Sequence, residues 1–133
     1  MIQYHLESSA PHLRIDLSGT VSGDEVTREL ASLPDDVAGL PEEFVALIVY
    51  PELYLIEEEA VGPLFYAVTH LLHARPARCV FANGGHHLHP GLREYIERLA
   101  RDGQVVFVES EADATQHIEQ RHTSRRASSD PTA

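Results

Sequence analysis

The apolar run Phe44–Tyr50 is the feature that most constrains the fold of this chain. Its residues are rich in β-branched and aromatic side chains, and the run stops at Pro51. A short run without polar alternation is typical of a strand covered on both faces, as in a parallel sheet. A buried helical segment is the alternative, but the β-branched content and the proline favour a strand. We therefore predict a central strand here.

An acidic turn and a helix follow this strand. After a predicted loop over 52–56, the turn formed by Glu57, Glu58 and Glu59 precedes apolar residues at helical spacing. We predict a helix over about 60–73 that packs back on the sheet, with Pro63 near its start, where a missing N–H costs little. Carboxylates in a first helical turn are stabilised by the helix dipole by about 0.3–1 kcal/mol each.

The other patterns predict more layers of a single α/β domain. Strands are expected over 2–6, 12–18, 78–82 and 104–108, and helices over 23–33, 91–101 and 111–120. The first two strands suit a hairpin, and the later strands alternate with helices. This order predicts a mostly parallel mixed β-sheet of about five strands with about four helices.

The chain length of 133 residues suits one domain with a sizeable core. We expect that domain over 1–121, followed by a disordered polar tail over 122–133, which has no apolar residue larger than Ala or Pro. No apolar run approaches the roughly 20 residues of a membrane span. The N-terminus lacks signal-peptide features, and the one cysteine, Cys79, suits a reducing compartment. We expect a cytoplasmic protein.

The charge of the chain is strongly negative. Ten basic residues, all arginine, face 21 acidic ones, so the net charge is −11. Such a chain repels phosphate backbones, and we expect no binding to nucleic acid. An acidic face suits a basic partner protein, although solubility alone would also account for the composition.

With this order of elements, the chain resembles the STAS domain family, which includes bacterial anti-sigma factor antagonists and the cytoplasmic ends of sulfate transporters. The resemblance covers roughly residues 2–120. The stretches that carry it are Leu17–Thr20, the strand, loop and helix start over 45–64, and the C-terminal runs Leu92–Ile96, Gly103–Phe107 and Ser110–Ala114. It implies a STAS-like α/β fold and a regulatory, non-enzymatic role.

The chain departs from that family at the acidic turn. The family's antagonists start the central helix with Asp-Ser-Ser-Gly, and a Ser there is phosphorylated by the partner kinase. Here Glu57 takes the Asp place, Glu58 and Glu59 the two Ser places, and Ala60 the Gly place. A carboxylate carries about half the charge of a phosphoserine. Glu59 thus either imitates a permanently phosphorylated state or, with its neighbours, merely suits a helix N-terminus.

The resemblance implies a surface that binds a regulatory protein, either an anti-sigma factor or a kinase-like protein. The expected partner-binding residues are Tyr54, Ile56, Glu57, Glu58, Glu59 and Gly62. Tyr54 and Ile56 either form the rim of this surface or tuck under the edge of the sheet. The oligomeric state is left open.

A second candidate site is the loop after the strand predicted at 78–82. Asn83, Gly84, Gly85, His86 and His87 form a possible ligand loop. Parallel strands place this loop and the acidic turn at the same sheet edge, and Gly-Gly before a helix suits an anion. The alternative function is therefore a small-ligand or lipid-binding STAS-like module.

A metal-dependent enzyme is a third possibility. His86, His87 and His89 with the acidic turn supply zinc ligands, but no spacing fixes a tetrahedral site. The chain has no G-x-S-x-G elbow and no G-x-G-x-x-G loop. We predict no metal, no cofactor and no catalysis.

Overall fold

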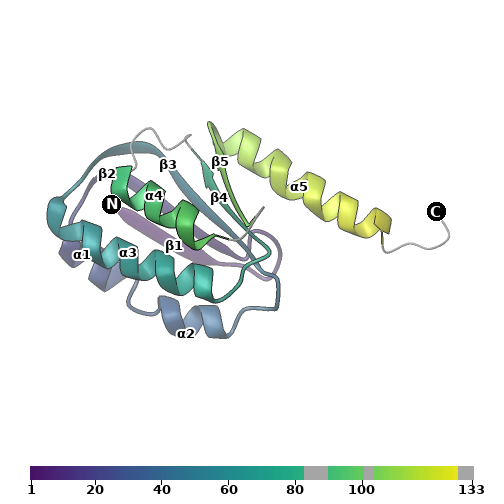
Figure 1. Cartoon of the computed structure of the whole chain (residues 1–133), viewed down its shortest axis with the longest axis horizontal. Coiled ribbons are helices and arrows are strands. Elements are labelled where there is room, and N and C mark those ends of the chain that lie inside the picture. The colour runs from purple at the N-terminus through teal and green to yellow at the C-terminus, as the bar shows by residue number, and fades with distance from the viewer. Residues whose placement is uncertain (83–89, 101–103, 129–133) are drawn as a thin grey trace.

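The computed structural model of the chain describes the backbone of residues 1–82, 90–100 and 104–128. Within this part the strands form one five-stranded sheet in the order β1-β2-β3-β4-β5 (Figure 1). Strand β1 is antiparallel to β2, and the other neighbours are parallel. The predicted mixed, mostly parallel sheet with an initial hairpin is therefore confirmed. The strands are β1 (Ile2–Leu6), β2 (Leu13–Val21), β3 (Val45–Ile56), β4 (Arg78–Ala82) and β5 (Val105–Val108).

Helices cover both faces of the sheet. The described helices are α1 (Gly23–Glu29), α2 (Leu33–Ala38), α3 (Glu58–His73), α4 (Pro90–Leu99) and α5 (Glu111–Ser128). Helices α1 to α4 pack on one face, over the larger core, whereas Ala114 and Ile118 of α5 pack on the other (Figure 1). No helix in the described part of the chain combines the length and apolarity that a membrane crossing needs.

The central strand β3 is buried on both faces, as its sequence predicts. Ala46, Ile48 and Tyr50 belong to the larger core, and Leu47 and Val49 belong to the core under α5. Because successive side chains of a strand point to opposite faces, a fully apolar run satisfies both cores at once.

The predicted end of this strand at Pro51 is wrong, as is the loop expected over 52–56. Strand β3 continues to Ile56 and stays paired with β2, through an irregularity in register near Pro51. Pairing between β3 and β4 extends only to Val49. Proline is tolerated at bulges and where no ladder hydrogen bond is lost, so Pro51 does not break the strand.

The helix expected over 23–33 is two helices. Helix α1 ends at Glu29, and α2 begins at Leu33 with Pro34 in its first turn. Proline fits a first turn because that N–H has no partner within the helix. Pro34 therefore lies in the first turn of a second helix, directly after the residue at which the single predicted helix was to end.

Helix α5 is longer than predicted. Its backbone runs to Ser128, whereas the predicted helix ended at about Gln120. The segment contains no glycine or proline before Pro131, and its Gln, Arg and Ala residues favour helix. Residues 129–133 lie outside the described part, and the division into a domain over 1–121 and a tail over 122–133 remains a prediction.

Candidate functional site

The acidic turn lies where α1 and α3 both begin. The N–H of Glu57 donates to the carbonyl of Val21 at 2.9 Å, which holds the ends of β2 and β3 together. Helix α1 starts two residues after Val21, and α3 starts directly after Glu57. A Cβ built on Gly23 would lie 2.8 Å from the carbonyl oxygen of Glu59. The two helix N-termini are therefore in direct backbone contact.

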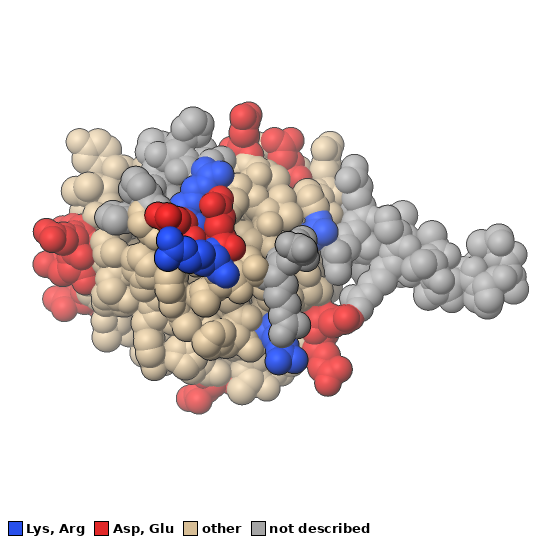
Figure 2. Space-filling model, in the orientation of Figure 1, with Lys and Arg blue, Asp and Glu red and all other residues tan. Residues whose placement is uncertain are grey.

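Acidic side chains from both helices converge at this point. Asp24 stands in the first turn of α1, and Glu58 and Glu59 stand in the first turn of α3. We call Asp24, Glu57, Glu58 and Glu59 the acidic patch. In Figure 2, acidic side chains gather at the left end of the molecule, where α1 and α3 begin in Figure 1. Two helix dipoles favour negative charge at this place.

Two residues near the patch have structural roles of their own. The Ser22 hydroxyl caps α1 by accepting from the N–H of Glu25 at 3.2 Å. The Glu25 carboxylate accepts from the N–H of Ile2 at 3.1 Å and lies 3.5 Å from the N-terminal amine. Glu25 is thus engaged in holding β1, and the carboxylates of the acidic patch are the ones that face outward.

The Glu57 carboxyl interacts with the neighbouring Glu59 carboxyl. A side-chain hydrogen bond to Glu59 raises the pKa of the Glu57 carboxyl above its usual range. Partial desolvation and repulsion from Glu59 and Asp24 add to this increase in pKa. Because the pKa of Glu57 is raised, this carboxyl is the one whose protonation reduces the charge of the patch as the pH falls.

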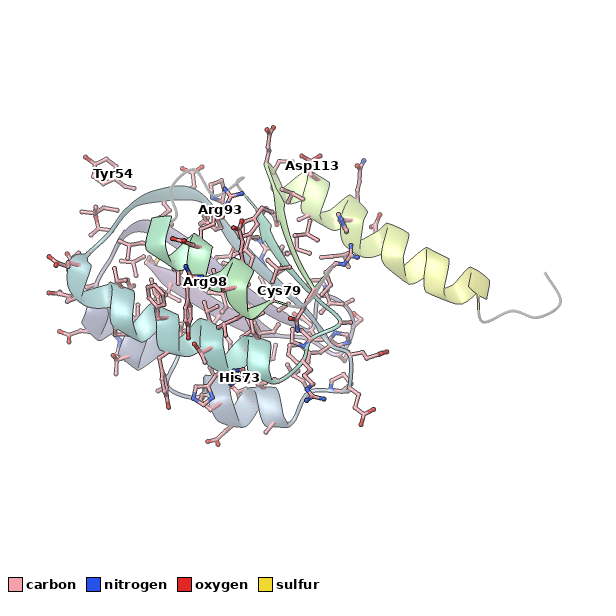
Figure 3. All side chains as sticks on the ribbon, viewed as in Figure 1. Tyr54, His73, Cys79, Arg93, Arg98 and Asp113 are labelled. Atoms are coloured by element: carbon pink, nitrogen blue, oxygen red, sulfur yellow. The ribbon has the colours of Figure 1, made fainter. Side chains whose placement is uncertain are left out.

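The other expected partner-binding residues lie on either side of the turn. Tyr54 is 82% exposed near the end of β3 and points away from the sheet (Figure 3). It does not tuck under the sheet edge. Ile56 is partly buried and packs against the larger core. Gly62 is exposed in α3, and a Cβ built on it would meet nothing within 4 Å.

The predicted ligand loop and histidine cluster fall on a part of the chain that the structure does not describe. Asn83, Gly84, Gly85, His86 and His87, together with His89, lie outside the described residues. Among the residues that are described, no group of three or more His, Cys, Asp or Glu side chains is arranged to hold a metal ion.

Cys79 has no nucleophilic character. It is fully buried in β4, and burial raises the pKa of its thiol. Since the thiolate is the reactive form, a protonated thiol in the core is inert. Cys79 is a packing residue of the larger core.

A second surface feature escaped the sequence analysis. An apolar groove of about 210 Å³ runs between α3 and the segment formed by α1 and the start of α2. The sequence does contain one sign of this groove: Tyr66 is a large aromatic residue that lies off the buried stripe of α3. That stripe consists of Ala60, Leu64, Ala67, Leu71 and Leu72. Tyr66 is 65% exposed at the rim of the groove.

The comparisons with known proteins find relatives in structure only. No family model and no curated protein matches the sequence. The anti-sigma factor antagonist SpoIIAA, in its unphosphorylated form, superposes with a TM-score of 0.61 at 14% identity, over 90% of this chain and 98% of SpoIIAA.

A second solved structure is an uncharacterised protein of the DUF3478 family from Shewanella loihica, which has a SpoIIAA-like fold. It superposes with a TM-score of 0.58 at 22% identity, over 88% of this chain and 93% of that one. At these identities the likeness concerns the fold. The chain therefore has a STAS-like fold, the fold of the anti-sigma factor antagonist SpoIIAA.

Proposed function

We propose that the chain is a non-enzymatic regulatory module that binds a partner protein through the acidic patch, as an anti-sigma factor antagonist would. The observation that carries this proposal is the exposed carboxylate pair of Glu58 and Glu59 at the start of α3. The nearly complete structural coverage of SpoIIAA supports it, because SpoIIAA is an anti-sigma factor antagonist of the same fold.

The electrostatics of the patch favour a basic partner. In the described part of the chain, no salt bridge joins Glu58 or Glu59 to an arginine. These carboxylates are thus available to an arginine or lysine of another protein. Charge complementarity of this kind mainly sets the association rate and the choice of partner.

The start of α3 offers no hydroxyl for phosphorylation. Its first residues are Glu58, Glu59 and Ala60. We infer that phosphorylation at this position does not switch the binding of the partner on or off. The carboxylate of Glu59 supplies about half the charge of a phosphoserine and fewer acceptor oxygens, so any likeness to a phosphorylated state is partial.

The alternative of a small-ligand or lipid-binding module has weaker support. Pockets for drug-sized ligands usually measure ~300–1,000 Å³. The groove beside α3 has a volume of about 210 Å³, and a hollow of about 430 Å³ between α2 and the end of α3 is more open to solvent. A protein partner therefore accounts better for the exposed features at this end of the molecule.

Calorimetric titration with an anti-sigma factor from the same organism tests the proposal. The variant Glu58→Arg/Glu59→Arg should bind at least about tenfold more weakly than the wild type, which corresponds to about 1.4 kcal/mol. The control variant Glu7→Arg/Glu42→Arg changes the net charge equally. Both residues are exposed and lie near the starts of β2 and β3, at the opposite end of these strands from the acidic patch. Equal affinities of the wild type and Glu58→Arg/Glu59→Arg would refute the proposal.

A further inference from the structure

We propose that the apolar groove beside α3 receives an apolar side chain of the partner segment whose basic side chain pairs with the acidic patch. This inference rests on the proposed function and specifies the chemistry of the partner. The expected partner presents an aromatic or large aliphatic residue at a fixed distance from an arginine or lysine.

The size and lining of the groove suit a side chain. Its walls come from Val26, Leu30 and Ala31 on one side and from Pro63, Tyr66 and Ala67 on the other. An apolar cavity of about 150 Å³ is known to hold a benzene-sized group. The groove volume of about 210 Å³ therefore accommodates a phenylalanine or leucine side chain, but not a drug-sized ligand.

Tyr66 supplies the groove with an exposed aromatic side chain. Its ring lies edge-on to the ring of His70, with 4.5 Å between the centroids, and it is 65% exposed. The larger core does not include it. Tyrosine is among the residue types that are enriched in binding hot spots.

The acidic patch forms one end of this groove. Glu59 lies four residues before Pro63, so the two share a face of α3. On the opposite wall, Gly23 lies against Glu59, and Val26 follows one turn later in α1. The surface over α3 is mostly uncharged in Figure 2, with the acidic side chains gathered at its start.

Helix geometry sets the spacing within the partner. Glu59 and Tyr66 are seven residues apart in α3, which corresponds to about 10 Å along the axis at 1.5 Å per residue. Arg28, the basic residue of α1, pairs with Glu29 and not with a carboxylate of the acidic patch, with 3.2 Å between its Nε and Oε1 of Glu29. A segment with a basic and an apolar side chain about 10 Å apart would engage both features.

Selection of twelve-residue peptides displayed on phage against the full-length protein tests this inference. The enriched sequences should combine a large apolar residue with an arginine or lysine at the stated spacing. Synthetic versions, titrated by calorimetry, should lose at least tenfold in affinity for Tyr66→Ala and for Glu59→Arg. Affinity for the control Leu6→Ala should be unchanged, since Leu6 is an exposed apolar residue of β1.

Three outcomes would overturn the inference. These are a lack of enriched peptides, enrichment of peptides without a basic residue, and equal affinity for the wild type and Tyr66→Ala. A lack of enriched peptides could also be accompanied by binding of the fluorescent dye anilinonaphthalene sulfonate to the wild type but not to Tyr66→Ala. That result would assign the groove to a small apolar ligand. Suppose that the peptides depend on Tyr66 and Glu59 but that an anti-sigma factor binds Glu58→Arg/Glu59→Arg as tightly as the wild type. The anti-sigma factor would then be refuted as the partner, and the groove would stand as a binding site for a partner segment of the stated chemistry.

Discussion

Gly23 at the start of α1 lies against the backbone of Glu59 in the first turn of α3. A Cβ at position 23 would come within 2.8 Å of the Glu59 carbonyl oxygen and 3.1 Å of its carbonyl carbon. Backbone atoms cannot move aside as the end of a flexible side chain can. The absence of a side chain at Gly23 is therefore what lets the two helix N-termini meet and the acidic patch assemble.

The substitution Gly23→Ala should destabilise the fold. The added methyl group overlaps the Glu59 backbone, and overpacking of this kind typically costs about 1–3 kcal/mol. Urea denaturation followed by circular dichroism measures the change in the free energy of unfolding. The control Gly62→Ala should stabilise by roughly 0.5–1 kcal/mol, because Gly62 lies within α3 and has open space around it. A Gly23→Ala variant as stable as the wild type would disprove this contact.

The stability should fall at mildly acidic pH because of His12. Its Nδ1 accepts a hydrogen bond from the N–H of Val45 at 3.1 Å, and burial lowers the pKa of its ring. The folded state thus favours the neutral ring. This stabilisation is complete above the unfolded pKa of about 6.5 and is lost as the pH falls through the folded pKa.

The variant His12→Asn isolates that effect. The Asn Oδ1 replaces Nδ1 as the acceptor and does not titrate in this range. Between pH 7.5 and 5, the free energy of unfolding should decrease less in His12→Asn than in the wild type. Parallel curves for the two proteins would show that His12 has no part in the pH dependence.

The pKa of Glu57 should depend on Glu59. In Glu59→Gln, the amide donates to the Glu57 carboxylate and the neighbouring negative charge is gone, so the pKa of Glu57 should fall. Carbon-detected NMR titration of the side-chain carboxyls follows it directly. The control Glu58→Gln should leave the pKa of Glu57 unchanged, since Glu58 does not contribute to the shift. Equal effects of both substitutions would contradict the paired geometry.

A serine at position 59 should restore a phosphorylation site. Glu59 takes one of the serine places in the family pattern and is exposed in the first turn of α3. After co-expression with an anti-sigma factor kinase, Glu59→Ser should gain one phosphate by mass spectrometry, whereas Glu59→Ala should gain none. An unmodified serine would show that the kinase does not recognise this surface.

Much of the fold could be predicted because the central strands are simple. The unbroken apolar run Phe44–Tyr50 predicts a strand buried on both faces, and the alternation over 12–18 predicts a strand buried on one. Two of the errors occur at prolines, and a third concerns the end of α5, which runs to Ser128. Pro51 and Pro34 are breakers by local rules, but partial pairing of β3 and the first turn of α2 tolerate them. Whether a proline is tolerated at such a place depends on packing and pairing partners that are distant in the sequence.

The candidate site was only half predictable for the same reason. Glu57, Glu58 and Glu59 are contiguous, so the sequence reveals them as one turn. Asp24 joins them only because Gly23 brings α1 against α3. The groove is likewise built from two helices, and its walls are small or ordinary apolar residues without a motif.

The most direct test of the regulatory role is a quantitative pull-down from the native cell extract. Tagged wild type, Glu58→Arg/Glu59→Arg and the control Glu7→Arg/Glu42→Arg are compared by mass spectrometry of the captured proteins. We predict that a kinase-like or sigma-regulatory protein is captured by the wild type and the control and is lost from Glu58→Arg/Glu59→Arg. Equal capture of every protein by all three baits would contradict a partner-binding role for the acidic patch.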